Sequence, residues 1–140
     1  MKKIILTMLA VLLLASGCSS GKGKIEYVSI DRAFEMMDQK ESFLLLVSKD
    51  SCTHCKDLEA MLKKELPKQD LIIYNVVMDE SSATAYEQDK ERLSERLDEP
   101  NKTPHVYEIK KGEVNSELLG YSAEKPENFW DWVKSLSKNE

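Results

Sequence analysis

The sequence has little of what marks a large, nucleic-acid-binding or membrane-spanning protein. Its 140 residues leave room for one compact domain and a short appendage, but not for a second domain. Its 20 basic residues are outnumbered by 25 acidic ones, which argues against nucleic acid as a partner. Its longest apolar run, at residues 4–14, is shorter than the roughly 20 residues that a helix needs to cross a bilayer.

The N-terminal segment nevertheless has the layout of an export signal. Two lysines precede the apolar run at residues 4–14, and three small residues follow it. Residues 14–18, Leu-Ala-Ser-Gly-Cys, resemble a bacterial lipobox, in which cleavage before the cysteine leaves a thiol that carries a diacylglycerol. The segment departs from that pattern at Ala15, where leucine is usual. We therefore expect residues 1–17 to be a lipoprotein signal peptide and Cys18 to be lipidated, with a transmembrane anchor as the alternative.

Lipidation would place the protein outside the cytosol, anchored to the bacterial membrane. Residues 18–24 are too poor in apolar side chains to pack, which predicts a flexible tether ahead of one domain at 25–140. Removal of the signal peptide takes away two lysines, so the net charge moves from −5 to −7. Three cysteines are an odd number for an exported protein, but a lipidated Cys18 leaves one pair, Cys52 and Cys55. Outside the cytosol such a pair can persist as a disulfide.

Hydrophobic patterning predicts an alternation of strands and helices. The continuous apolar run at 43–47 is typical of a central strand covered on both faces, and Asp31 could cap the helix that precedes it. The charged segment at 84–97 predicts a mostly solvated helix. The expected elements are strand 25–29, helix 31–39, strand 42–48, helix 52–66, strand 71–78, helix 84–97, strands 105–109 and 114–119, and helix 127–136. This order predicts an α/β fold with a central mixed sheet and helices on both faces.

The motif Cys52-Thr53-His54-Cys55 follows directly on the predicted central strand. Cys55 shares the apolar stripe of the next helix with Leu58, so it should face the core while Cys52 lies at the exposed end. Unpaired N–H groups and the dipole at a helix N-terminus favour negative charge, and so favour the reactive thiolate. We expect Cys52 to be the attacking sulfur and Cys55 the resolving one, with Thr53 and His54 forming the active-site loop.

A Cys-x-x-Cys pair also has other interpretations. Half of a zinc site has the same spacing, but the sequence offers no second pair to complete a four-cysteine site. A purely structural disulfide would close a very short loop and would add little entropic stabilisation. Thiol–disulfide chemistry is the favoured hypothesis, and metal binding or an inactive binding module are the alternatives.

These features resemble the thioredoxin superfamily over about residues 25–137. The resemblance rests on the cysteine motif at a strand-to-helix junction, Thr103-Pro104 before the next-to-last strand, the turn at 110–114, and Gly120 before the last helix. It implies a thioredoxin fold, a three-layer α/β/α sandwich with a central mixed sheet, and thiol–disulfide oxidoreductase activity. It also implies a cis peptide bond at Pro104, with Thr103 and Pro104 presenting backbone to a substrate peptide.

Several positions depart from the pattern of cytosolic thioredoxins. Those proteins have Trp before the first cysteine, a buried Asp six residues before it, and a proline that kinks the following helix. This chain has Ser51, Leu46 and Ala60 at these positions, and the missing acid argues against fast general-purpose reduction. His54 matches oxidising relatives of the DsbA type, in which an imidazole can help to hold the thiolate. A solvated loop histidine is the alternative.

The expected function is that of an extracytoplasmic oxidoreductase acting on the cysteines of exported proteins, with no cofactor beyond its own cysteine pair. Its expected partners are those proteins, the membrane through the lipid anchor, and a membrane redox partner. The chain also resembles, in fold and motif, the bacteriocin transport accessory group, so a non-catalytic secretion accessory module is one alternative. A copper carrier is another, in which His54 and His105 would join the two cysteines. The other interpretation of His105 is an ordinary strand residue that binds no metal.

Overall fold

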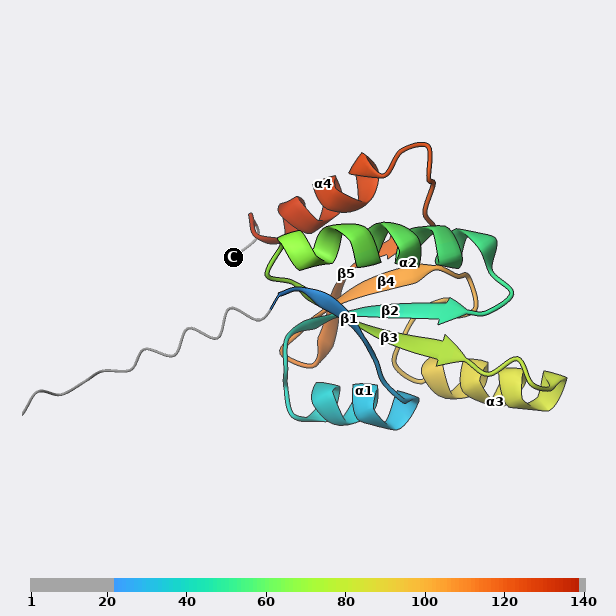
Figure 1. The fold of residues 1–140 in the computed structure, drawn as a ribbon. Coiled ribbons are helices and arrows are strands. Elements are labelled where there is room, and N and C mark those ends of the chain that lie inside the picture. Colours follow the sequence, from blue (N-terminus) through green and yellow to red (C-terminus); the bar gives the residue numbers. More distant parts are fainter. Residues whose placement is uncertain (1–21, 139–140) are drawn as a thin grey trace, which may run out of the picture.

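The computed structural model describes residues 22–138, which form one sheet with helices packed on both faces (Figure 1). The order of elements is the one that the hydrophobic pattern predicted. In chain order they are β1 (Lys24–Tyr27), α1 (Ile30–Asp38), β2 (Phe43–Lys49), α2 (Thr53–Glu65), the 3-10 turn η1 (Leu66–Lys68), β3 (Ile72–Met78), α3 (Ala83–Leu93), β4 (His105–Lys110), β5 (Glu113–Leu119) and α4 (Glu127–Leu136).

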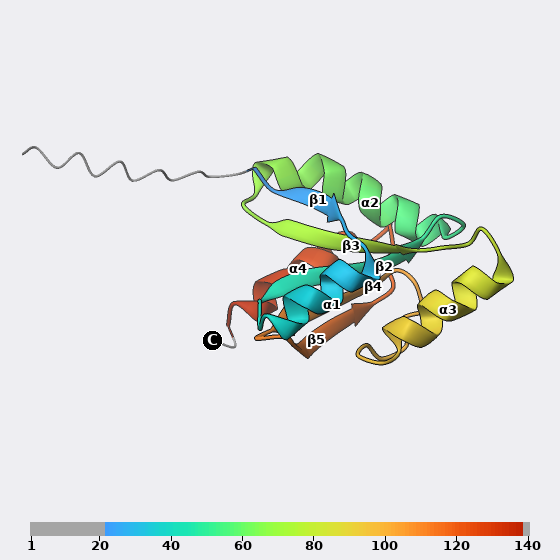
Figure 2. The ribbon, with the colours of Figure 1, turned by 90° about the horizontal axis from the view of Figure 1, so that it is seen from below.

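The five strands lie in the order β1-β3-β2-β4-β5. Strands β1, β3 and β2 run parallel, whereas β4 is antiparallel to β2 and β5 is antiparallel to β4. The central strand β2 has five of its seven residues buried, which explains its continuous apolar run. Helices α2 and α4 cover one face and α1 and α3 the other (Figure 1 and Figure 2). The predicted three-layer α/β/α sandwich with a mixed sheet is therefore confirmed.

Two hydrophobic clusters hold the layers together, one on each face of the sheet. Because side chains alternate along a strand, Leu44 and Leu46 of β2 pack against α2 and α4, while Leu45 and Val47 pack against α1 and α3. The cluster beneath α2 and α4 also contains the predicted apolar stripe that starts in α2, namely Leu58, Leu62 and Leu66. This packing fixes α2 over the sheet, and with it the cysteine pair at the start of the helix.

The first helix begins with a different cap from the one that the sequence suggested. Ser29 is the N-cap of α1, and its hydroxyl oxygen accepts a hydrogen bond from the backbone N–H of Arg32 at 3.1 Å. Asp31 lies within the first turn, where its carboxylate pairs with Arg92 of α3. The Asp31 prediction was wrong because the chain enters the helix two residues earlier, at Ser29, which takes the capping position instead.

The third helix, predicted at 84–97, ends earlier than expected, at Leu93. The Ser94 hydroxyl donates a hydrogen bond to the Lys90 carbonyl at 2.8 Å, and turns follow. Leu97 still reaches the core, because its backbone N–H binds the Leu93 carbonyl at 2.9 Å and its side chain is 3% exposed. The chain that follows crosses to the start of β4 and passes the cysteine pair on the way.

The described part of the chain enters the sheet at its edge. The N–H of Gly23 binds the Gln69 carbonyl at 2.8 Å, and β1 starts at Lys24, one residue before the predicted strand. The predicted signal peptide and the lipidation site Cys18 lie outside the described residues. Within residues 22–138, none of the helices has the length and apolar character needed to span a bilayer.

Candidate active site

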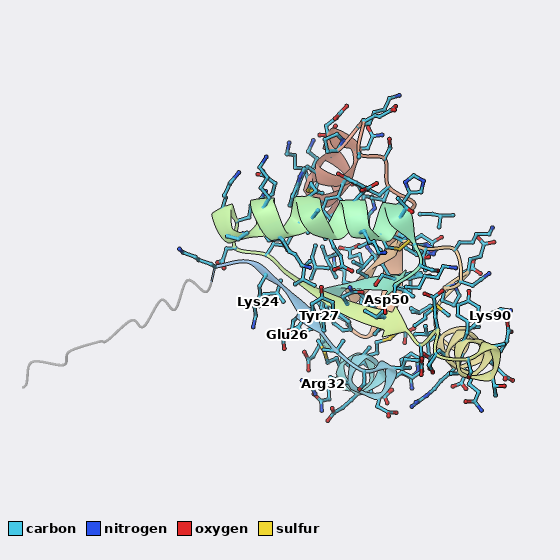
Figure 3. The ribbon with its side chains drawn as sticks, turned by 45° about the vertical axis from the view of Figure 1, so that its right-hand side comes forward. Lys24, Glu26, Tyr27, Arg32, Asp50 and Lys90 are labelled. Atoms are coloured by element: carbon cyan, nitrogen blue, oxygen red, sulfur yellow. A yellow bond between two sulfur atoms is a disulfide. The ribbon has the colours of Figure 1, made fainter. Side chains whose placement is uncertain are left out.

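The predicted cysteine pair lies at the junction between β2 and α2, at one end of the sheet. Cys52 and Cys55 form a disulfide, and their Cα atoms are 5.2 Å apart. Cys52 is the N-cap of α2, with an extended backbone and a sulfur that accepts the N–H of Cys55 at 3.1 Å. Figure 3 shows Asp50 at this end of the molecule and Lys24, where β1 starts, at the other. The motif therefore occupies the strand-to-helix junction that its spacing predicted.

The two sulfur-bearing residues differ in their access to solvent. Cys55 is 1% exposed, as expected from its place on the apolar stripe of α2. Cys52 is half-buried, and the two residues between the cysteines, Thr53 and His54, are exposed. A substrate sulfur can therefore approach Cys52 from solvent but cannot approach Cys55 without displacing protein.

The helix that Cys52 caps favours a negative charge on its sulfur. The N–H of Cys55 donates to Cys52 Sγ. The first turn of α2 contains no acidic residue whose negative charge would disfavour a thiolate on Cys52. Two lysines, Lys63 and Lys64, occupy the last turn, where a helix favours positive charge. A thiolate on reduced Cys52 would thus gain both a hydrogen bond and a favourable dipole.

The loop before β4 lies against Cys52. The peptide bond between Thr103 and Pro104 is cis, as the resemblance implied. The carbonyl oxygen of Thr103 lies 3.5 Å from Cys52 Sγ. The N–H of Gly120 binds the Pro104 carbonyl at 2.8 Å, and Gly120 has a φ of 82°, which lets the chain turn away from the end of β5. The structure therefore brings Thr103 and Pro104 to the cysteine pair, while their role in binding substrate stays a prediction.

A chain of polar side chains lies between the sheet and α2. Ser48 and Asn75 are buried, at 1% and 0% exposure, and the Ser48 hydroxyl donates to Asn75 Oδ1 at 2.9 Å. The Asn75 amide donates to Glu59 Oε1 at 3.3 Å. The Tyr27 hydroxyl donates to Glu59 Oε2 at 2.7 Å, and Lys63 Nζ donates to the same oxygen at 3.3 Å. A carboxylate whose side chain is only 19% exposed is thus held at the inner side of the active-site helix.

Glu59 supplies an acidic group that the sequence analysis missed. Leu46 occupies the expected acid position and is fully buried, but its register partner on β3 is Asn75, which binds Glu59. Glu59 follows Cys55 by four residues, so both lie on the same side of α2. That spacing was a signal in the sequence. The partners of Glu59 were not, because Asn75 and Tyr27 lie 16 and 32 residues away along the chain.

The two histidines have different surroundings. His54 is exposed beside the cysteines, whereas His105 is 1% exposed and its ring stacks on Tyr107 with centroids 4.1 Å apart. The Tyr107 hydroxyl lies 2.7 Å from His105 Nδ1 and donates to the Asp98 carbonyl at 2.6 Å. Burial raises the pKa of Tyr107 far above its ordinary value. His105 is therefore a buried strand residue, and no group of three or more His, Cys, Asp or Glu within residues 22–138 is arranged to hold a metal ion.

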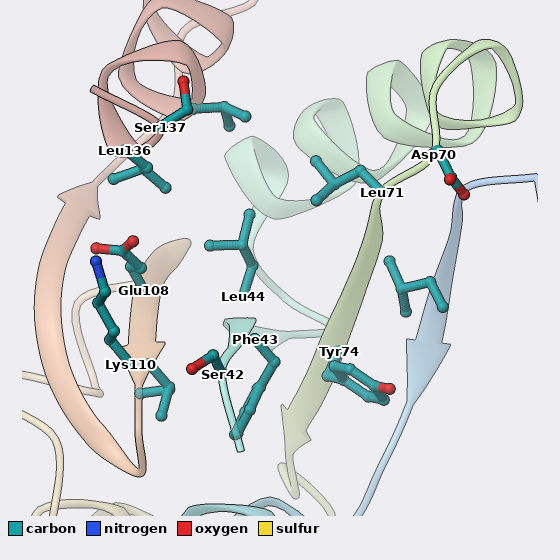
Figure 4. Close-up of a pocket in the computed structure, with 13 residues that line it drawn as sticks. Ser42, Phe43, Leu44, Asp70, Leu71, Tyr74, Glu108, Lys110, Leu136 and Ser137 are labelled. Atoms are coloured by element: carbon teal, nitrogen blue, oxygen red, sulfur yellow. The ribbon is translucent and has the colours of Figure 1, made fainter. Parts of the chain in front are cut away.

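Two hollows on the surface differ in their relation to the cysteines. One of about 560 Å³ lies at the far end of the sheet, where the start of β2 and the ends of β4 and α4 meet (Figure 4). Phe43, Leu71 and Leu136 line it, and it takes no part in the cysteine site. A second hollow, of about 660 Å³, lies between α2 and α4 and includes Asp57 and Tyr121. Only this second hollow borders the helix that carries the cysteines.

No protein-family model and no curated protein matches this sequence. Several solved thioredoxin structures do match the fold. Thioredoxin f from spinach chloroplast is 17% identical with a TM-score of 0.56, covering 80% of this chain and 95% of its own. A mutant thioredoxin from Halobacterium salinarum is 15% identical with a TM-score of 0.58, covering 80% of this chain and 89% of its own. Thioredoxin from Trypanosoma brucei brucei is 15% identical with a TM-score of 0.58, covering 82% of this chain and 92% of its own. These likenesses establish that the chain has a thioredoxin fold.

Proposed function

We propose that this chain is a thiol–disulfide oxidoreductase that acts outside the cytosol on the cysteines of exported proteins, anchored to the bacterial membrane by lipid on Cys18. One observation carries the proposal, namely the contrast between its two bonded sulfurs. Cys52 caps a helix and is half-buried, so part of it meets solvent, whereas Cys55 is buried one turn inside the same helix. Such a pair can react with a substrate at one sulfur and close again through the other.

In the reduced protein, the first step belongs to the Cys52 thiolate. It attacks one sulfur of a substrate disulfide, a bond forms between Cys52 Sγ and that sulfur, and the substrate S–S bond breaks. The other substrate sulfur leaves as a thiolate and takes a proton from water. The Thr103 carbonyl, 3.5 Å from Cys52 Sγ, is a hydrogen-bond acceptor positioned beside the incoming chain.

In the second step, Cys55 resolves the mixed disulfide. Its sulfur attacks Cys52 Sγ, the Cys52–Cys55 bond re-forms, and the remaining substrate sulfur leaves as a thiolate that water protonates. Because Cys55 is buried, its own proton needs an acceptor inside the protein. Glu59 is the carboxylate placed to take this proton, since it lies one helical turn away and is partly open to solvent. The reverse sequence oxidises a substrate dithiol, and the reduction potentials of the two couples decide the direction.

The proposed location is supported by the sequence. The lysine pair, the apolar run and the lipobox-like residues 14–18 are the expected features of an exported lipoprotein. An extracytoplasmic setting also suits a cysteine pair whose function requires it to cycle through a disulfide. A membrane redox partner would then restore the pair to its working state.

Turnover of protein disulfides tests the proposed activity. The full-length chain, purified in detergent and freed of metal, should catalyse insulin reduction by dithiothreitol or the oxidation of a reduced unfolded protein by glutathione disulfide. Cys52→Ser should catalyse neither reaction. Wild-type protein that catalyses neither reaction would overturn the proposal. Tight copper or zinc binding by the same sample would then favour a metal carrier, and the lack of both properties would favour a non-catalytic binding module.

A further inference from the structure

A carboxylate outside the cysteine motif contacts the residue immediately before Cys52. Glu80, in the connection between β3 and α3, accepts two hydrogen bonds from Ser51. The backbone N–H of Ser51 donates to Glu80 Oε2 at 2.7 Å, and the Ser51 hydroxyl donates to Oε1 at 2.6 Å. The contact joins residues 29 positions apart, so it ties two separate loops together at the end of the sheet where the disulfide lies.

The turn that carries Glu80 is itself held on both sides. The N–H of Asp79 binds the carboxylate of Asp89 on α3 at 2.8 Å, and the N–H of Ser81 binds the Asp79 carboxylate at 2.8 Å. Ser82 then caps α3 by accepting the N–H of Ala85 at 3.0 Å. Glu80 therefore extends from a hydrogen-bonded turn between two regular elements, which fixes where its carboxylate meets Ser51.

The charge of Glu80 acts against that of a Cys52 thiolate. The hydrogen bonds from Ser51 hold the pKa of Glu80 below its ordinary value, so the carboxylate is ionised wherever a thiol titrates. A negative group bound to the residue before Cys52 disfavours a negative charge on the Cys52 sulfur, whereas the helix N-terminus favours it. Other charged or titratable groups in the segments near this end include Lys49, whose charge also lowers the pKa of Glu80, and Asp50, His54, Lys56, Asp57, Asp79, Asp89, Glu99 and Lys102.

We propose that Glu80 is a positioning residue that clamps the loop before Cys52 and, through its charge, opposes ionisation of the Cys52 thiol. The inference rests on the proposed thiol–disulfide chemistry of Cys52. As a consequence, the Cys52–Cys55 couple has a more reducing potential than it would have with the helix N-terminus alone, because destabilising the Cys52 thiolate destabilises the reduced form.

The pH dependence of Cys52 alkylation tests this. In the reduced full-length chain, the rate of reaction with iodoacetamide is followed against pH, and mass spectrometry assigns the label to Cys52. Glu80→Gln should lower the midpoint by about half a unit, as expected for unit charges several ångströms apart in a water-like dielectric. Ser51→Ala removes one hydrogen bond but keeps the charge, so its midpoint should stay in place. High salt should reduce the difference between wild type and Glu80→Gln.

A matched control is Glu87→Gln, which removes an exposed carboxylate of α3 that pairs with Lys90 instead of the cysteine loop. It should leave the midpoint unchanged. Equilibration with glutathione, at a pH above both alkylation midpoints, should show the Cys52–Cys55 couple of Glu80→Gln to be more oxidising by about threefold in the equilibrium constant, or ~15 mV. A Glu80→Gln midpoint equal to or above that of wild type, in protein with unchanged circular dichroism, would overturn the inference. A wild-type chain that exchanges with no disulfide would instead overturn the proposed function. The alkylation midpoints would still show whether Glu80 opposes ionisation of Cys52, because they need no disulfide substrate.

Discussion

The Glu59 carboxylate lies one helical turn from the buried sulfur of Cys55, so replacing it should separate the two chemical steps. We expect Glu59→Gln to leave the attack by Cys52 unchanged and to slow resolution by Cys55 roughly 100-fold, the lower range of general acid–base catalysis. Single-turnover reaction with a fluorescent disulfide peptide, quenched with acid and separated by mass, measures the formation and decay of the mixed disulfide independently.

Glu65→Gln is the matched control, because it removes a carboxylate from the same helix that pairs with Lys68. Its mixed disulfide should decay as in wild type. Glu59→Asp should restore part of the rate, and the pH profile of the decay should change in Glu59→Gln alone. Equal decay in wild type and Glu59→Gln would show that the Cys55 proton takes another route.

Among individual residues, the sequence identified those whose signal is local. Cys52 and Cys55 stand at fixed spacing beside a strand, and Pro104 follows a threonine just before another strand, so each could be placed without knowing the fold. The contacts of Glu59 and Glu80 could not, although Glu59 stands one helical turn from Cys55, because their partners Asn75 and Ser51 lie far away in the chain and meet them only when the sheet forms and α2 packs on it.

At the scale of elements, α2 is held over the sheet by leucines at helical spacing. Leu62 is 0% exposed and packs in the cluster beneath the helix, so Leu62→Ala should lower the free energy of unfolding by about 2–5 kcal/mol. Urea denaturation of the oxidised protein measures this. Val114→Ala, at a position of edge strand β5 that is 37% exposed, is the control and should cost less than about 1 kcal/mol. Similar losses in both variants would contradict the assignment of the core.

Tyr107 on strand β4 should make the stability of the fold fall at alkaline pH. Burial raises the pKa of Tyr107 in the folded state, so the unfolded chain loses this proton first as the pH rises. The contribution of Tyr107 to the free energy of unfolding is fully present below its unfolded pKa of about 10. Above that pH the free energy of unfolding should decrease, by up to about 1.4 kcal/mol per pH unit. Urea denaturation between about pH 9 and pH 11 should show a shallower loss for Tyr107→Phe than for wild type. Parallel pH profiles would show that Tyr107 does not cause the loss.

The elements themselves were predictable because their signals are periodic. The continuous apolar run of β2 and the leucine stripe of α2 both follow from burial. Two helix ends were misplaced, because each depends on a hydrogen bond between a serine hydroxyl and the backbone. Ser29 caps α1 from outside the expected helix, and Ser94 ends α3 while Leu97 stays buried beyond it.

For the whole molecule, the sequence predicts an anchor at a site outside the described residues. We expect the mature protein to begin at Cys18 and to carry lipid there, because residues 14–18 resemble a lipobox. Intact-mass analysis of the membrane fraction should find a chain without residues 1–17 and with a diacylglycerol adduct. Cys18→Ser should accumulate unprocessed and unlipidated. Soluble protein that retains Met1, or cleavage at another position, would remove the anchor and the proposed location together.

Covalent trapping in cells tests the central claim of thiol–disulfide chemistry most directly. Cys55→Ser keeps the partly exposed attacking sulfur but removes the resolving one, so mixed disulfides with substrate proteins should accumulate and appear as reducible bands on a non-reducing gel. Cys52→Ser should give none, since Cys55 is buried. Mass spectrometry of the trapped bands should identify exported proteins. Adducts in Cys52→Ser but not in Cys55→Ser would reverse the roles of the two sulfurs, and adducts in neither variant would contradict the account.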